Sequence, residues 1–203
     1  MSEAVGRRRI IDQQAILDAA ERVVGRDGAA NMTVDAVARE AGVSKASVLY
    51  DYKSKQALIE AVVDRAFQRD NEYHTRVEHG IGNHSDHAIR ARIVAAAEPP
   101  PKEFRAVALN LSAALTLDAT LRTKMQSNQT ATIERILRGS KSPRGALLAY
   151  LALEGLKLLE HLDFHHFAHN DRSTLIREIN WLVTAEPQAI DLPESPGARL
   201  PRL

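Results

Sequence analysis

Apolar residues recur with a helical period along most of the chain. In the stretch 33–55 they follow the spacing i, i+3, i+4 and i+7, which forms the stripe of a short amphipathic helix: Val34, Val37, Ala38 and Ala41. Similar spacing predicts a helix over 10–26 before this stretch, and a long helix from 54 to about 79 after it.

Beyond residue 86 the helical period returns. It predicts helices over 86–97, 104–115, 121–137, 146–162 and 173–184. The helix over 146–162 is apolar around much of its circumference, so we expect it to be buried on more than one side. Nothing along the chain predicts a strand, and the fold class that we expect is all-α.

A tight turn joins two short helices within the stretch 33–55. Gly42 reaches a positive φ at little cost and so ends the first helix, and Ser44 can cap the second helix two residues later. Thr33 is well placed to cap the first helix, and Ser54 to cap the long helix that follows. Two helices joined by so short a turn cross steeply, which predicts a helix-turn-helix.

These elements divide the chain into four parts. Residues 1–9 are basic and show no periodicity, so we expect a flexible basic arm. Residues 10–53 form a three-helix helix-turn-helix domain, and a long fourth helix joins it to a helical C-terminal domain over 54–186. The segment 187–203 carries enough Pro and Gly to be a disordered tail.

The composition narrows the chemistry and the compartment. The 203 residues include no cysteine, which excludes disulfides, thiolate nucleophiles and cysteine-based zinc sites. No run approaches the roughly 20 apolar residues of a membrane span, so we expect a cytoplasmic protein without membrane contact. The net charge of +1 means that any binding to nucleic acid depends on a local basic surface.

The second helix of the helix-turn-helix carries side chains that can reach phosphates and base edges. They are Lys45, Ser47, Tyr50 and Tyr52. The arm contains Arg7, Arg8 and Arg9, which have two interpretations. They are part of a solvated terminus, or they contact phosphates or the minor groove of DNA beside the helix-turn-helix. Double-stranded DNA is the partner that this pattern predicts.

The segment 27–55 resembles the N-terminal domain of the TetR family of one-component transcriptional regulators. In that family a glycine ends the first helix, a threonine five residues later starts the second, and an Ala-Gly-Val-Ser turn leads into the recognition helix. Gly28, Thr33 and residues 41–44 match these positions, and the Lys-Ser-Lys at 53–55 matches the opening of the fourth helix. In the rest of the chain the resemblance lies only in the succession of helices.

The resemblance also implies which residues contact DNA. Carried over by position, they are Thr33 and Lys55 beside phosphates, and Ser44, Lys45 and Ser47 on the recognition helix. The tyrosine that contacts a phosphate in the family falls on Leu49 here, and Tyr50 lies one residue, or about 100°, further around the helix. Either Tyr50 makes that contact through a slightly rotated helix, or it faces the bases and Leu49 has joined the core.

The function that the resemblance implies is that of a homodimeric, ligand-responsive DNA-binding regulator, most simply a repressor that a small molecule releases from its operator. The dimer also follows from geometry, because one short recognition helix needs a second half-site. An enzyme is not expected, since no nucleophile or acid–base constellation with recognisable spacing is present. The alternative is a helical adaptor or ligand-binding protein in which the helix-turn-helix is only a packing motif.

Four residues of the C-terminal helices are candidates for contact with the effector. They are Phe104, Asn110, Met125 and Glu154. Glu154 interrupts an apolar helix and has a second interpretation, as a partly exposed position beside the dimer seam. Gly155 beside it would let another helix approach closely, which favours a helical dimer interface there.

Three histidines repeat near the end of the predicted helix over 146–162. His161, His165 and His169 are spaced at i, i+4 and i+8, and histidines at i and i+4 can share a metal on one helix face. No catalytic H-E-x-x-H arrangement accompanies them, and Asp163 and Asn170 indicate that the helix ends within the run. A pH-sensitive or simple surface cluster is therefore the favoured interpretation, and we expect no metal and no cofactor.

Overall fold

The computed structural model describes residues 2–82, 85–99, 109–110, 112–115 and 118–188, with side chains from residue 13 onward. All regular secondary structure in these residues is α-helical, as predicted. The helices are α1 (Ser2–Asp27), α2 (Val34–Ala41), α3 (Lys45–Asp51), α4 (Lys55–Gly80), α5 (His87–Ala95), α7 (Ala119–Arg138), α8 (Pro143–His161) and α9 (His169–Leu182).

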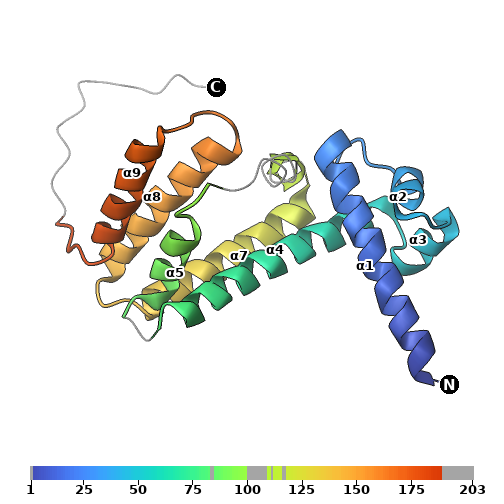
Figure 1. Ribbon diagram of the computed structural model, residues 1–203, viewed down its shortest axis with the longest axis horizontal. Helices are drawn as coiled ribbons and strands as arrows, with labels where there is room; N and C mark the ends of the chain where they lie inside the picture. The colour runs from blue at the N-terminus through green and yellow to red at the C-terminus, as the bar shows by residue number, and fades with distance from the viewer. Residues whose placement is uncertain (1, 83–84, 100–108, 111, 116–117, 189–203) are drawn as a thin grey trace.

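The helices form an elongated molecule. Figure 1 shows α1, α2 and α3 at one end and α5, α8 and α9 at the other, with α4 and α7 running side by side between them. The long helix α4 is therefore the connection between the two ends, as its length in the sequence predicted.

The turn between α2 and α3 has the predicted chemistry. Thr33 Oγ1 accepts a hydrogen bond from the Ala36 N–H at 3.1 Å, and Ser44 Oγ accepts one from the Ser47 N–H at 3.0 Å. Gly42 between them has φ +69°, in the left-handed region that glycine reaches without a steric penalty. Both caps and the glycine stop are confirmed, so local residue chemistry sets the helix-turn-helix.

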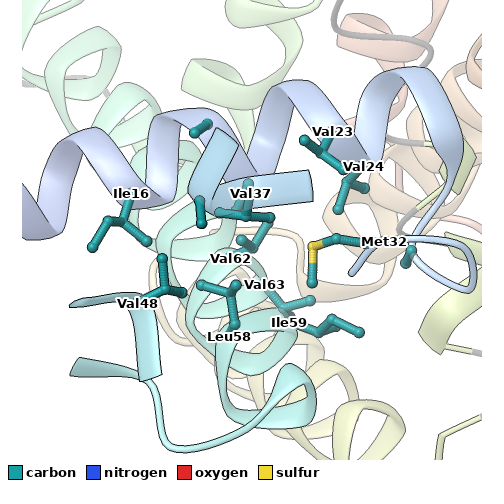
Figure 2. Packing of buried hydrophobic residues seen from close by; sticks show 14 of the residues in the cluster. Ile16, Val23, Val24, Met32, Val37, Val48, Leu58, Ile59, Val62 and Val63 are labelled. Atoms are coloured by element: carbon teal, nitrogen blue, oxygen red, sulfur yellow. The ribbon is translucent and has the colours of Figure 1, made fainter. Parts of the chain in front are cut away.

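A first hydrophobic core holds this end of the molecule together. Figure 2 shows its side chains converging from α1, α2, α3 and the first half of α4, and burying each of them contributes about 1.5–3 kcal/mol. The members labelled there are Ile16, Val23, Val24, Met32, Val37, Val48, Leu58, Ile59, Val62 and Val63. Leu121 of α7 is buried in the same core, so the C-terminal helices pack directly against the helix-turn-helix end.

The structure differs from the sequence prediction at the N-terminus. Residues 2–9, expected to be a non-helical arm, form the first turns of α1, which is continuous to Asp27. Extending an existing helix adds one hydrogen bond for each residue ordered, and the alanine and arginines of this segment are good helix formers. In Figure 1 this end of α1 projects beyond α2 and α3.

Helix α4 begins at the predicted cap, since Ser54 Oγ accepts a hydrogen bond from the Ala57 N–H at 3.0 Å. Further along, polar side chains of α4 meet polar side chains of α7 at three levels. The pairs are Asp64–Lys124 at 2.7 Å, Asn71–Asn128 at 3.0 Å and Glu78–Arg135 at 2.5 Å. The contact between these two helices therefore includes a row of polar pairs.

A second hydrophobic core joins α5, α7, α8 and α9. Its buried members include Ile89, Ile93, Ile136, Ala149, Leu153 and Ile179. Gly145 lies where α8 passes the end of α9, because a Cβ at this position would stand 2.4 Å from the Ala185 carbonyl oxygen and 2.5 Å from that of Leu182. Only a glycine permits this approach without a shift of the backbone.

A buried ion pair also fixes these helices. Arg172 of α9 donates to the Glu160 carboxylate of α8 at 2.7 Å and 3.1 Å, and both side chains are about 5% exposed. The same guanidinium donates to the carbonyl oxygens of Ala97 and Ala96, which follow α5. Arg172 thus joins α8, α9 and the segment that follows α5. The helical period of the sequence did not predict this ion pair.

Several sequence predictions fall wholly or partly outside the described residues. Of the helix expected over 104–115, residues 109–110 and 112–115 are described, and they are helical. Most of the tail expected over 187–203 lies outside the description. Among the helices that are described, none combines the length and the apolar character needed to cross a membrane.

Candidate nucleic-acid interface

Helix α3 presents its N-terminal turn to solvent. Ser44, Lys45 and Ser47 are all exposed, and the Oγ atoms of the two serines lie 2.9 Å apart. Lys45 Nζ donates to the Asp35 carboxylate of α2 at 2.8 Å. Because both partners are exposed, this ion pair contributes only about 0–1 kcal/mol. A phosphate can therefore replace the aspartate at little cost.

Thr33 lies at the end of the loop 28–33 that leads to α2, and Lys55, the first residue of α4, contacts the same loop. Lys55 Nζ donates to the carbonyl oxygen of Ala30 at 2.6 Å, in the loop that leads to α2. Thr33, at the end of that loop, uses its hydroxyl oxygen to cap α2 and keeps its hydroxyl proton for another acceptor. The geometry thus leaves both residues able to donate to a phosphate.

Tyr50 faces solvent, with 60% of the residue exposed. The Lys53 ammonium lies 5.1 Å from the centre of its ring, and Lys53 Nζ also donates to the Tyr50 carbonyl oxygen. Leu49 is half-buried but does not belong to the first hydrophobic core, whereas Tyr52 packs against it. Tyr52, the residue that follows α3, is thus directed inward, and burial raises its pKa. Tyr50 is the tyrosine that faces solvent.

Polar contacts from α1 hold α2 and α3 in place. Arg22 and Arg26 both donate to the Glu40 carboxylate of α2, at 2.8 Å and 3.1 Å, and these hydrogen bonds keep the pKa of Glu40 below its usual value. Gln13 donates to the Asp51 carboxylate at the end of α3 at 3.0 Å. The exposed face of α3 is therefore positioned by both an apolar core and polar ties.

The remaining predicted DNA contacts, Arg7, Arg8 and Arg9, have side chains outside the described part of the structure, and so does Phe104 among the effector candidates. Asn110 donates to the Gly25 carbonyl oxygen at 3.3 Å, which joins the C-terminal domain to α1. Met125 is half-buried on α7, and Glu154 forms an ion pair with Lys157 at 2.9 Å on α8. Asn110 thus lies at the junction with α1, while the other two lie on the helices of the C-terminal domain.

Sequence reasoning missed a group of polar side chains where α4, α5, α7 and α8 meet. This polar cluster consists of Asp70, His74, Arg92, Gln129, Thr132 and Tyr150. Arg92 donates to the Thr132 hydroxyl at 3.3 Å, and the Tyr150 hydroxyl donates to the side-chain oxygen of Gln129. Asp70 and His74, at i and i+4 on α4, were the only local signal for it.

The pKa values of two members reflect their surroundings. Burial, and secondarily the Glu154 carboxylate, raise the pKa of Tyr150 to about 12, so its hydroxyl stays protonated. Burial alone would raise the pKa of Asp70, but the hydrogen bond and charge of His74 and the charges of Lys157 and Arg92 outweigh it and hold that pKa below its usual value. Asp70 is therefore an anion facing the cations of other helices.

The three spaced histidines do not share a helix. His161 ends α8, His169 begins α9, and His165 lies in the loop between them, where its ring contacts Phe167. The helical period that would align them is broken by Asp163, which has φ +60°. Among the described residues there is no group of three or more potential ligands placed to hold a metal ion.

One face of α8 is apolar and exposed. Leu151 and Leu158 are each 55% exposed, and Leu148 and Gly155 continue the same stripe at helical spacing. A Cβ at Gly155 would meet nothing within 4 Å. This α8 stripe is thus left exposed by the described residues, although the sequence predicted that α8 is buried on more than one side.

Two family models match the chain. The model described as bacterial regulatory proteins of the tetR family matches residues 16–62, which span most of the first core. The model described as a tetracyclin repressor-like C-terminal domain matches residues 86–184, which contain α5 through α9. Comparison with curated proteins finds no match.

Solved structures are similar over nearly their whole length. A protein from Rhodococcus sp., described as a TetR-family transcriptional regulator, is 22% identical, covers 85% of this chain and 99% of its own, and has a TM-score of 0.68. A TetR-family member from Streptomyces coelicolor A3 is 21% identical (83% and 97% covered, TM-score 0.61). A transcriptional regulator from Saccharomonospora viridis, solved in complex with choline, is 19% identical (88% and 95% covered, TM-score 0.64). At these identities the likeness shows the fold.

Proposed function

Because the chain belongs to the TetR family of bacterial transcriptional regulators, we propose that it is a homodimeric repressor that a small molecule releases from operator DNA. Members of this family are DNA-binding regulators and not enzymes. The observation that carries the proposal is the presence of two exposed surfaces on one chain, the polar turn of α3 and the α8 stripe. The first is suited to DNA and the second to another copy of the chain.

The size of α3 supports the dimer. It has only seven residues, so a single copy can contact only a few base pairs. Specific recognition at cellular salt concentrations requires a larger interface, which two copies on a two-fold symmetric operator provide. Dimerisation is therefore part of how the regulator would read its site.

The α8 stripe is the surface that we assign to this contact. Its leucines are far more exposed than an apolar helix face normally is in a monomer. Gly155 has no packing role inside the protomer, because a side chain there would reach open space, but it would allow a helix of the second copy to approach closely.

The substitution Leu151→Glu tests this surface. It places a charge in the α8 stripe, so we expect light scattering to find a monomer and operator binding to fall. Val94→Glu is the matched control, because Val94 is a similarly exposed apolar residue on α5. If both variants dissociate to the same extent, or if neither dissociates, the assignment of the α8 stripe to the dimer contact is rejected.

A small-molecule effector is supported by the fold and by one relative. The structure of the Saccharomonospora viridis regulator contains choline, so this fold accepts a small ligand. In this chain α4 takes part in the first core and also carries Asp70 and His74 of the polar cluster. A ligand that shifts α4 would thereby move the helix-turn-helix, and operator DNA must weaken that ligand by the same factor by which the ligand weakens DNA binding.

Binding to a DNA fragment from the protein's own promoter region, measured by fluorescence anisotropy at several salt concentrations, tests the function directly. We expect saturable binding with a steep salt dependence, since phosphate contacts release counterions. A helical adaptor, in which the helix-turn-helix is only a packing motif, would show no such binding. Transcription from that promoter with and without the protein then distinguishes a repressor from an activator.

A further inference from the structure

The polar cluster contains hydrogen-bonding groups whose capacity the described residues do not fill. We propose, building on the function proposed above, that this cluster binds the effector and that the effector is a small organic carboxylate. The argument rests on the unmet bonding capacity of Arg92, His74 and Gln129.

Arg92 has little solvent and few partners. Its side chain is 12% exposed, yet among the described residues its guanidinium makes one hydrogen bond, to the Thr132 hydroxyl at 3.3 Å. The Asp70 carboxylate is 4.0 Å away, well beyond the roughly 2.7–2.9 Å of a charge-assisted hydrogen bond. A guanidinium carries five N–H donors in a planar fork, which matches the two oxygens of a carboxylate. The Arg92 guanidinium therefore has the geometry to bind a carboxylate, and among the described residues no carboxylate binds it in this way.

His74 is the second observation, independent of the first. It is only 8% exposed, and its Nδ1 atom has no hydrogen-bond partner among the described residues. Its other nitrogen, Nε2, faces the Asp70 carboxylate at 3.5 Å, which favours a proton on Nε2. Buried polar atoms are normally bonded, so a ligand atom beside Nδ1 accounts for this exception.

Gln129 adds a second donor beside Arg92. Its side-chain oxygen accepts the hydrogen bond of Tyr150, so its amide N–H groups point elsewhere. Within the described residues their partner is the sulfur of Met125 at 4.0 Å, a weak acceptor. Because Gln129 and Thr132 are three residues apart on α7, this amide lies on the same helix face as the hydroxyl that Arg92 contacts.

The charges decide between an anionic and a cationic ligand. The ionisable groups that the described residues place in and beside the cluster include two acids, Asp70 and Glu154, and two bases, Arg92 and Lys157. The Lys157 ammonium is already paired with the Glu154 carboxylate at 2.9 Å. The Asp70 carboxylate, in contrast, is 4.0 Å from the Arg92 guanidinium. Arg92 is therefore the cation of this set that an anionic ligand can pair with.

Calorimetric titration of the purified full-length protein tests the proposal. The probes are acetate, benzoate and octanoate, each compared with its uncharged amide, together with choline as a cation. We expect at least one carboxylate to bind about tenfold or more tightly than its amide, because only the anion pairs with the guanidinium.

The variant Arg92→Gln should remove the preference for carboxylate over amide. Arg90→Gln is the matched control on the same helix, since the Arg90 guanidinium donates to Asn180 and not to the cluster, and it should keep the preference. If Arg92→Gln does not fold, the ratio of carboxylate affinity to amide affinity of the unmodified protein decides.

Equal affinity for carboxylate and amide, tighter binding of choline than of every carboxylate, or no carboxylate binding at all would overturn the inference. Operator binding measured on the same preparation separates this result from the proposed function. Operator binding without carboxylate preference rejects only the effector class. If the same preparation does not bind operator DNA, the proposed function is rejected, whatever the titration shows.

Discussion

Arg172 is the residue whose removal most directly tests how the C-terminal domain is held together. Its guanidinium donates to the Glu160 carboxylate through Nε and Nη2, and to the carbonyl oxygens of Ala97 and Ala96 through Nη1 and Nη2. All of these distances lie between 2.6 Å and 3.1 Å. The arginine therefore serves three groups at once, the Glu160 carboxylate and two backbone carbonyls.

The substitution Arg172→Met keeps the bulk of the side chain and removes the donors. Leaving the buried Glu160 charge without its partner costs about 3–5 kcal/mol, and each carbonyl left unbonded costs up to about 1–3 kcal/mol. Ala97 is exposed, so water can replace part of the second loss. We expect a total of about 4–6 kcal/mol, which is a large share of the roughly 5–15 kcal/mol that stabilises a domain.

Urea unfolding followed by circular dichroism measures this loss. The double variant Glu160→Leu/Arg172→Met should recover about 2–4 kcal/mol of it, because no uncompensated charge remains buried. Arg177→Met, on the exposed side of α9, is the control and should change stability by no more than about 0.5 kcal/mol. The reasoning is refuted if the double variant is no more stable than Arg172→Met. It is also refuted if Arg172→Met is as stable as the control Arg177→Met.

Substitutions at three further positions address the interface and the packing of α8. Lys55→Ala should lower operator affinity and reduce the slope of log affinity against log salt by about 0.9, whereas Lys141→Ala, at an exposed site before α8, should change neither; an unchanged slope for the first would contradict a phosphate contact. Tyr50→Phe should weaken operator binding and Tyr50→Ala should weaken it further, since the hydroxyl and the ring both contribute; wild-type affinity for the phenylalanine variant would reject the hydroxyl contact. Gly145→Ala should destabilise the protein by about 1–3 kcal/mol in thermal unfolding, because its Cβ has no room beside α9. The same change at Gly80, where a Cβ would meet nothing within 4 Å, should not; equal losses would show that the close approach is unimportant.

The helix-turn-helix could be predicted because its information is local. A cap needs one hydroxyl and the N–H three residues later, as at Thr33 and Ser44, and a helix stop needs one residue that tolerates positive φ, as at Gly42. These relations hold within a few residues of the chain. The placement of Tyr50 was harder, because whether it or Tyr52 turns inward depends on the rotation of α3 against the first core.

The C-terminal half shows what periodicity leaves out. The apolar spacing of α8 predicted burial on more than one side, but the structure exposes Leu151 and Leu158 and buries Glu160 instead. An apolar stripe identifies a helix face without naming the neighbour that covers it, and that neighbour can be another copy of the chain. For the same reason the spacing did not predict the ion pair between Glu160 and Arg172, since the two residues lie on different helices.

The amino-acid sequence by itself determined that this protein is helical, where its second, third and fourth helices begin, and which short helix is offered to DNA, because caps, turns and helical period act between near neighbours in the chain. Tertiary structure alone decided that Arg92, His74 and Gln129 meet in one polar cluster, since they come from three helices whose packing is set by the whole hydrophobic core. The region that we assign to DNA was therefore open to prediction, whereas the region that we assign to the effector was not.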